Sequence, residues 1–165
     1  MNICFFDLST GGKLNWDSVL SRVEKHRVIY VGEIHDLKAS HELQMKVIDA
    51  LVGRGYKVAV ALEMFQQNYQ KFFDEYTSGK LSEVEMLYLT EWHKDIWKYA
   101  REKNLKLLAI NIPTEFRKKV RDMTYFQIRM LRVMIPWDEG MAFSISKFLK
   151  ENPEYKVVVL VGWRG

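Results

Sequence analysis

Four short, largely apolar runs constrain the fold of this chain more than any other feature. They begin at Val28, Lys57, Leu105 and Val157, and within them apolar residues do not alternate with polar ones. Such runs are typical of parallel strands that are covered on both faces. Segments with helical spacing separate them. The sequence therefore predicts an α/β fold, with a mostly parallel β-sheet and helices on both faces.

The segments between the four runs carry helical patterns with recognisable ends. We expect helices near 15–27, 40–52, 69–78, 82–89, 92–104, 114–120, 125–134 and 138–150. Gly53 and Gly55 end the second of these, and Ser82 with Glu85 matches a capping box at the start of the fourth. The aromatic stripe at 69–76 is interpreted as core packing. Residues 1–10 hold a short strand, followed by a turn at 9–12.

Composition restricts the class of protein. The chain has 165 residues, of which 48% are hydrophobic and 28% charged, as expected for one soluble globular domain spanning 1–165. The net charge is +4, but the basic residues are dispersed, so we interpret them as solvated surface and expect no nucleic-acid partner. Cys4 is the single cysteine, which excludes an internal disulfide and a thiolate zinc cluster. No apolar run approaches a membrane span of about 20 residues.

Titratable and polar residues follow the predicted strands. Glu33 and His35 come directly after the first strand, Glu63 follows the second and Asn111 the third. Because the carboxyl ends of parallel strands meet at one edge of a sheet, we expect these residues to converge on one functional cleft. Gly162 ends the fourth strand at the same edge.

Two carboxylates and an imidazole in one cleft could hold a divalent metal ion or provide a general base. The spacing does not choose between these roles, and all three are also ordinary loop residues. His41 either faces the same cleft or covers the start of the next helix. His26 and His93 lie on segments expected at the surface and are interpreted as bystanders.

Two other kinds of site have little support. Only Gly32 follows the first strand, so no glycine-rich loop of the nucleotide-binding type is present there. No serine lies between glycines at a strand end, which argues against a nucleophile elbow.

Six motifs, taken together and in order, resemble those of the ChaN-like haem-binding lipoprotein family. They lie at 32–36, 41–44, 62–65, 90–92, 109–113 and 137–142. The likeness extends over most of the chain, from about residue 8 to 162. That family is bacterial, is tied to iron or haem acquisition, and is distantly similar to erythromycin esterases and to Tiki and TraB metalloprotease-like proteins.

The resemblance implies a haem-binding protein of bacterial haem or iron uptake, with a cofacial haem pair held across a homodimer. The candidate haem-binding residues are His35, His41, Glu33, Glu63, Asn111 and Trp137, and tyrosine, histidine and methionine all remain open as the axial ligand. A binding protein is favoured over an enzyme on the resemblance alone.

Two alternatives remain open. In a metal-dependent hydrolase of the esterase or peptidase kind, Glu33 would act as base or ligand, while His35 and Glu63 would hold the ion and activate water. In the other, the cleft is inherited from an ancestral hydrolase but idle.

The sequence departs from the family pattern in three places. The stretches near 92–96 and 121–137 are shorter than usual, which suggests missing loops. A second Gly-x-x-His is expected after the last strand, but Gly165 stands at the histidine position, so either the C-terminus is truncated and the histidine lies just beyond it, or the histidine is absent and the metal site lacks its second half. Cys4 lacks the apolar leader of a lipoprotein signal. A lipid anchor outside this chain would place the protein in the cell envelope, and its absence would place it in the cytoplasm.

Overall fold

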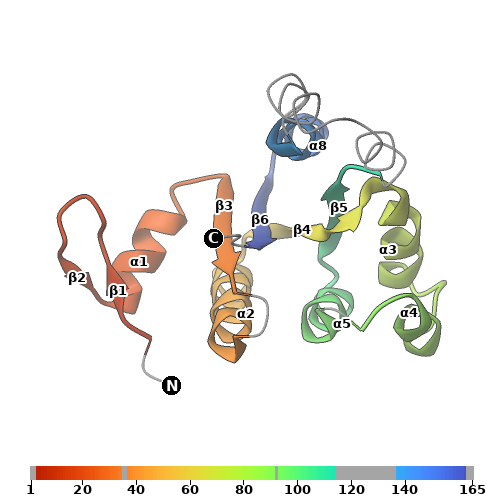
Figure 1. The fold of residues 1–165 in the computed structure, drawn as a ribbon, viewed down its shortest axis with the longest axis horizontal. Helices are drawn as coiled ribbons and strands as arrows, with labels where there is room; N and C mark the ends of the chain where they lie inside the picture. The colour runs from red at the N-terminus through yellow and green to blue at the C-terminus, as the bar shows by residue number, and fades with distance from the viewer. Residues whose placement is uncertain (1–2, 35–36, 92, 114–136, 163–165) are drawn as a thin grey trace, which may run out of the picture.

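The computed structural model describes residues 3–34, 37–91, 93–113 and 137–162, with side chains from 139 onward in the last range. Four parallel strands form the central sheet, in the order β3 (Val28–Glu33), β6 (Tyr155–Gly162), β4 (Lys57–Gln66) and β5 (Lys106–Asn111) (Figure 1). The predicted α/β class with a parallel sheet is confirmed. The last strand of the chain, β6, lies between β3 and β4, and it brings Gly162 beside Glu33.

One face of the sheet is covered by α2 (Lys38–Gly53), α3 (Gln70–Thr77) and α5 (Lys94–Glu102), and α1 (Trp16–Val23) adds Leu20 at its margin. Side chains of these helices pack on alternate residues of the strands, such as Ile29, Val31, Val60 and Leu62. The largest fully buried side chain here is Trp97 of α5, whose ring meets Tyr76 edge-on at 5.0 Å between centroids. This is the larger of the two apolar cores in the described part of the chain.

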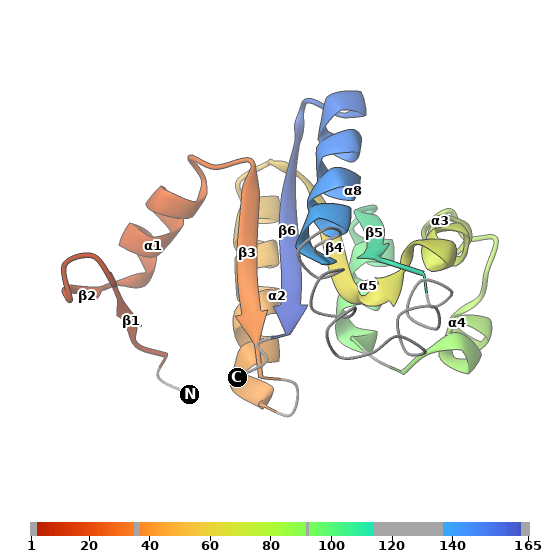
Figure 2. The same cartoon turned by 45° about the horizontal axis from the view of Figure 1, so that its top comes forward.

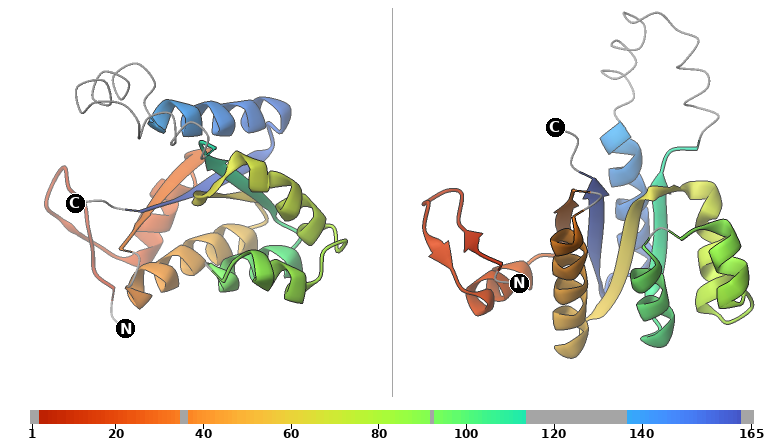
Figure 3. Two further views of the ribbon diagram at one scale, coloured as in Figure 1. Left: turned by 45° about the vertical axis from the view of Figure 1, so that its right-hand side comes forward. Right: turned by 60° about the horizontal axis from the view of Figure 1, so that its bottom comes forward.

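The opposite face is covered by α8 (Trp137–Glu151), as the edge-on view in Figure 3 shows, where the sheet lies between α8 and the layer containing α2 and α5. Ile145 of α8 packs against the other set of strand residues, including Ala59, Ala61, Val157 and Val159. Figure 2 shows β3 and β6 side by side, with α2 behind them. The sheet is therefore buried on both sides, which explains why its strands do not alternate in polarity.

A small antiparallel hairpin, β1 (Phe5–Phe6) and β2 (Lys13–Leu14), precedes α1. The sequence predicts one short strand and a turn here, and the turn residue Gly11 adopts a positive φ of 69°. Phe5 packs on Trp16 at 5.6 Å between ring centroids, which attaches the hairpin to the start of α1.

Three helix ends lie where their local chemistry places them, whereas the helix predicted over 15–27 ends earlier, at Val23, and the one predicted over 92–104 is shorter, at Lys94–Glu102. Asn15 caps α1 by accepting a hydrogen bond from the backbone N–H of Ser18. Gly55 follows α2 with a φ of 82°, and the capping box of Ser82 and Glu85 begins α4 (Glu83–Leu89). A 3-10 turn, η1 (Gln67–Tyr69), leads from β4 into α3. The helices predicted at 114–120 and 125–134 lie outside the described residues.

None of the helices formed by the described residues is long and apolar enough to serve as a membrane-spanning segment.

Candidate functional site

The two candidate carboxylates lie at the carboxyl edge of the sheet but on opposite faces. Glu33 continues the row of Ile29 and Val31 and faces the layer of α2 and α5. Glu63 continues the row of Ala59 and Ala61 and lies in a pocket with Met141 of α8. The expectation that Glu33 and Glu63 share one cleft is therefore corrected. Successive residues of a strand point to opposite faces, so two strand ends can meet at one edge while their side chains diverge.

Glu33 is a buried carboxylate with a fixed orientation. Only 2% of the residue is exposed. Gln44, which is fully buried in the second turn of α2, donates a hydrogen bond of 2.6 Å from Nε2 to Oε2 of Glu33. The other oxygen, Oε1, lies 3.6 Å from Nε2 of His93. A buried carboxylate is costly unless it is paired and hydrogen-bonded, so this arrangement stabilises Glu33 in its place.

His93, which the sequence places at the surface, is instead buried beside Glu33, and the structure corrects that prediction. Its residue is 6% exposed, and its Nε2 lies 2.8 Å from Sδ of Met64 in β4. The backbone at His93, immediately before α5, has a positive φ of 54°, and this turn directs the side chain inward. The backbone carbonyl of His93 stabilises the turn by accepting hydrogen bonds from the N–H groups of Ile96 and Trp97. An acidic residue in the first helical turn, Asp95, was the available sign that α5 begins after His93 rather than at 92.

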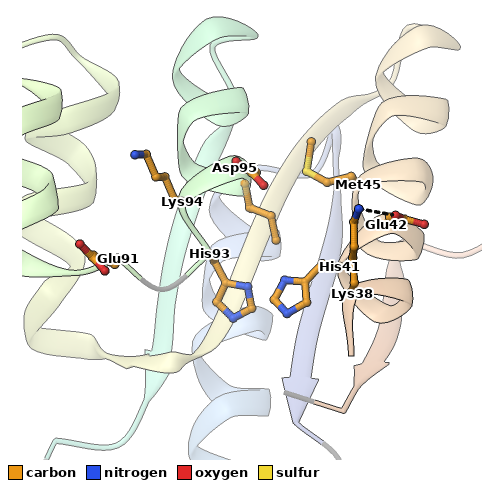
Figure 4. A pocket seen from close by; sticks show the side chains of 9 residues that line it. Lys38, His41, Glu42, Met45, Glu91, His93, Lys94 and Asp95 are labelled. Atoms are coloured by element: carbon orange, nitrogen blue, oxygen red, sulfur yellow. Dashed lines mark ion pairs between the residues drawn. The ribbon is translucent and has the colours of Figure 1, made fainter. Parts of the chain in front are cut away.

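His41 joins this cluster from the first turn of α2. Its ring centroid lies 5.4 Å from that of His93, and Figure 4 shows the two imidazoles next to each other. One ligand atom from each of Glu33, His41 and His93 lies within 4.8 Å of the others. The end of β3, the first turn of α2 and the residue before α5, which is distant from the other two in the sequence, thus bring two imidazoles and a carboxylate together. His41 therefore lies beside Glu33, one of the residues of the expected cleft, and beside His93.

A hollow of about 770 Å³ opens over the two histidines, between α2 and the segment that leads into α5. Most of its other lining residues are charged, as Figure 4 shows: Lys38, Glu42, Glu91, Lys94 and Asp95. Small polar molecules and ions therefore have access from solvent to the half-buried His41, whereas the side chain of His93 lies beneath the surface.

A second hollow, of about 390 Å³, lies on the α8 face and is mainly apolar. Glu63 lines it together with Tyr30, Met141, Val159, Val161 and Gly162. The Glu63 carboxylate accepts a hydrogen bond of 2.7 Å from the backbone N–H of Gly162, and its backbone carbonyl accepts one of 2.7 Å from the Asn111 amide. Glu63 therefore joins three strands at their carboxyl ends.

Two candidate residues cannot be placed. His35 lies outside the described residues, as does the side chain of Trp137, the first residue of α8.

Comparison with known families agrees with this architecture. The family model described as haem-binding uptake, Tiki superfamily, ChaN matches residues 19–126, well over half of the chain. The chain belongs to this family. No curated protein matches the sequence. The ChaN family match confirms the resemblance that the six motifs indicate, and it spans Glu33, His41, Glu63 and His93.

Solved structures show the same fold in two settings. The structure described as cofacial haem binding to ChaN of Campylobacter jejuni has a TM-score of 0.62 at 19% identity and covers 96% of this chain and 79% of that one. RRSP, a MARTX toxin effector domain from Vibrio vulnificus, has a TM-score of 0.60 at 19% identity. The match to RRSP covers 90% of this chain but 30% of the toxin chain. At these identities the likeness is one of fold.

Proposed function

We propose that this protein binds haem and handles it in bacterial haem or iron uptake, as its family description indicates. The observation that carries the proposal is the match to the haem-binding uptake family across residues 19–126. The net charge of +4 favours the anionic propionates of haem.

The α8 face provides the better haem surface of the two hollows. Most of the residues that line it are apolar in type, which suits the porphyrin plane, whereas most of the residues around His41 and His93 are charged. Tyr30 is 61% exposed there, beside Val159 on the neighbouring strand. A tyrosine phenolate is an established axial ligand of haem iron. His93 is buried and cannot approach the iron of a planar ligand without rearrangement. We therefore propose Tyr30 as the iron ligand.

A haemin titration followed by visible absorption tests this proposal. The wild-type chain is expected to shift the Soret band saturably, and Tyr30→Phe is expected to lose that shift. Tyr88→Phe serves as the control, because Tyr88 is 87% exposed and lies on α4, away from the strands that line the hollow. No saturable shift with the wild-type chain would overturn haem binding itself. Loss of the shift in His41→Gln but not in Tyr30→Phe would move the haem to the opposite face.

We extend the proposal to a haem pair held between two copies of the chain, because the related ChaN structure is described as binding haem cofacially. Light scattering after size-exclusion chromatography is expected to show the mass of a dimer when haemin is added and that of a monomer without it. A monomer with bound haemin would contradict the pairing while leaving haem binding in place.

A further inference from the structure

We propose that Glu33, His41 and His93 form a binding site for a divalent transition-metal ion, separate from the haem surface and on the other face of the sheet. The site lies where β3 ends, α2 begins and α5 begins. It does not depend on haem binding, and its ligands differ from the set of Glu33, His35 and Glu63 that the sequence suggests.

The geometry meets the first requirement of a metal site, which is convergence of ligand atoms. The three donor atoms lie within 4.8 Å of one another. In a tetrahedral site with metal–ligand bonds of about 2.1 Å, ligand atoms are about 3.4 Å apart. Side-chain rotations that bring the atoms closer by up to about 1.4 Å complete that arrangement, and Glu33 Oε1 and His93 Nε2, at 3.6 Å, are already close to it.

Supporting contacts hold the ligands in place. The bond from Gln44 fixes one oxygen of Glu33 and leaves the other facing His93. Such outer contacts orient metal ligands and are part of well-formed sites. The backbone at His93 occupies the left-handed region, which few residues other than glycine adopt, although asparagine, aspartate and histidine do so more often than the rest. Unfavourable backbone conformations of this kind are concentrated at functional sites, and this one directs the imidazole into the cluster.

The donor set selects the kind of ion. Two imidazoles and one carboxylate suit Zn²⁺ and neighbouring first-row divalent ions, whereas Ca²⁺ and Mg²⁺ prefer oxygen ligands and Cu(I) prefers sulfur. Three protein ligands leave a further position open. The hollow over His41 and His93 gives water or a small anion access to that position. The arrangement is therefore that of a site with an exchangeable ligand rather than a closed structural site.

The competing explanation is an ion pair in which a protonated histidine balances the buried Glu33 carboxylate. Both explanations provide a positive charge that offsets the cost of burying the Glu33 carboxylate. Only the metal site predicts stoichiometric uptake of an ion that requires all three side chains.

The test uses the full chain, freed of metal with a chelator and then titrated with Zn²⁺ by calorimetry and with Co²⁺ by visible absorption. We expect one ion per chain and a Co²⁺ spectrum of low-symmetry coordination. His41→Gln, His93→Asn and Glu33→Gln are each expected to weaken binding by about 10- to 100-fold or more. Asparagine is chosen at His93 because it tolerates the left-handed backbone.

Two matched variants serve as controls. His26→Gln and Glu151→Gln change the same residue types at exposed positions outside the cluster and its hollow, and both are expected to bind as the wild type does. His41 is only half-buried, so His41→Gln keeps the test valid if Glu33→Gln fails to fold. The proposal is overturned if the wild-type protein takes up no Zn²⁺, or if all three cluster variants bind Zn²⁺ as tightly as the wild type does. Either result leaves the ion pair as the explanation of the cluster. Tyr30→Phe is expected to retain Zn²⁺ binding, and His41→Gln is expected to retain haemin binding. These two results would show that the metal site is separate from the proposed haem surface.

Discussion

Gln44 and Glu33 are joined by a hydrogen bond of 2.6 Å in the interior, between the second turn of α2 and the last residue of β3. Gln44 is fully buried and Glu33 nearly so. The bond aligns the start of α2 with the end of β3 and sets which carboxylate oxygen faces His93. One amide side chain thereby connects the packing of the sheet to the geometry of the cluster of Glu33, His41 and His93.

Replacing Gln44 with methionine is expected to lower the free energy of unfolding by about 1–3 kcal/mol, because it leaves an oxygen of a buried carboxylate without its donor while keeping the side-chain volume. Urea denaturation measures the change. Gln67→Met is the control, since Gln67 makes its hydrogen bond to Ser144 at the surface, and a change within about 0.5 kcal/mol is expected there. Equal effects at both positions would show that the buried bond has no special weight.

The two glycines at the end of α2 are expected to respond in opposite directions to alanine. Gly55 has a φ of 82°, so Gly55→Ala is expected to cost about 1–2 kcal/mol through backbone strain. Gly53 is the last residue of the helix, and a Cβ added there meets nothing within 4 Å. Gly53→Ala is therefore expected to raise stability by up to about 1 kcal/mol. Thermal unfolding of both variants measures the contrast, and two changes of the same sign would contradict it.

The sequence predicts the local elements well because their signals are local. The capping box at Ser82 and the glycine after α2 depend on residues within one helical turn, and both predictions are confirmed. The four strands are recognised by their apolar runs. The family resemblance is confirmed as well, although it depends on several dispersed motifs rather than on one decisive pattern.

The site could not be derived in the same way. Because the strands are buried on both faces, polarity does not reveal which face each residue of a strand points to, and Glu33 and Glu63 were assigned to one cleft. The position of β6 between β3 and β4 is a long-range property that no local pattern indicates. His93 is polar and lies among charged neighbours in the sequence, and its burial depends on long-range contacts with Glu33 of β3 and Met64 of β4 that no local pattern indicates.

Ionisation of the Tyr99 phenol is expected to lower the free energy of unfolding at alkaline pH. Burial, and then a hydrogen bond of 2.6 Å to the Asp49 carboxylate, raise the pKa of Tyr99 from 10.0 to about 12. Because the pKa of Tyr99 is higher in the folded state than in the unfolded state, its phenol contributes to the free energy of unfolding in full below pH 10, and that contribution is lost as the pH rises through about 12. The difference in unfolding free energy between the wild type and Tyr99→Phe is therefore expected to be constant up to pH 10 and to shrink above it.

Urea unfolding at a series of alkaline pH values measures that difference. Lysine residues titrate in the same range, but they are common to both proteins and cancel. Tyr88→Phe, at an exposed position, is expected to follow the wild-type profile. A difference between wild type and Tyr99→Phe that does not change with pH would show that the phenol has no linked proton.

Glu63 and Glu33 offer the most direct test of the separation between the two faces. Glu63→Gln retains an oxygen that can accept the hydrogen bond from Gly162, so the variant is expected to fold and to bind Zn²⁺ as tightly as the wild type. Glu33→Gln removes the charged ligand and is expected to weaken Zn²⁺ binding by about tenfold or more. Calorimetric titration of the two variants under the same conditions compares them. If both lost the ion to the same degree, the two carboxylates would share it, and the cleft expected from the sequence would replace the two separate sites.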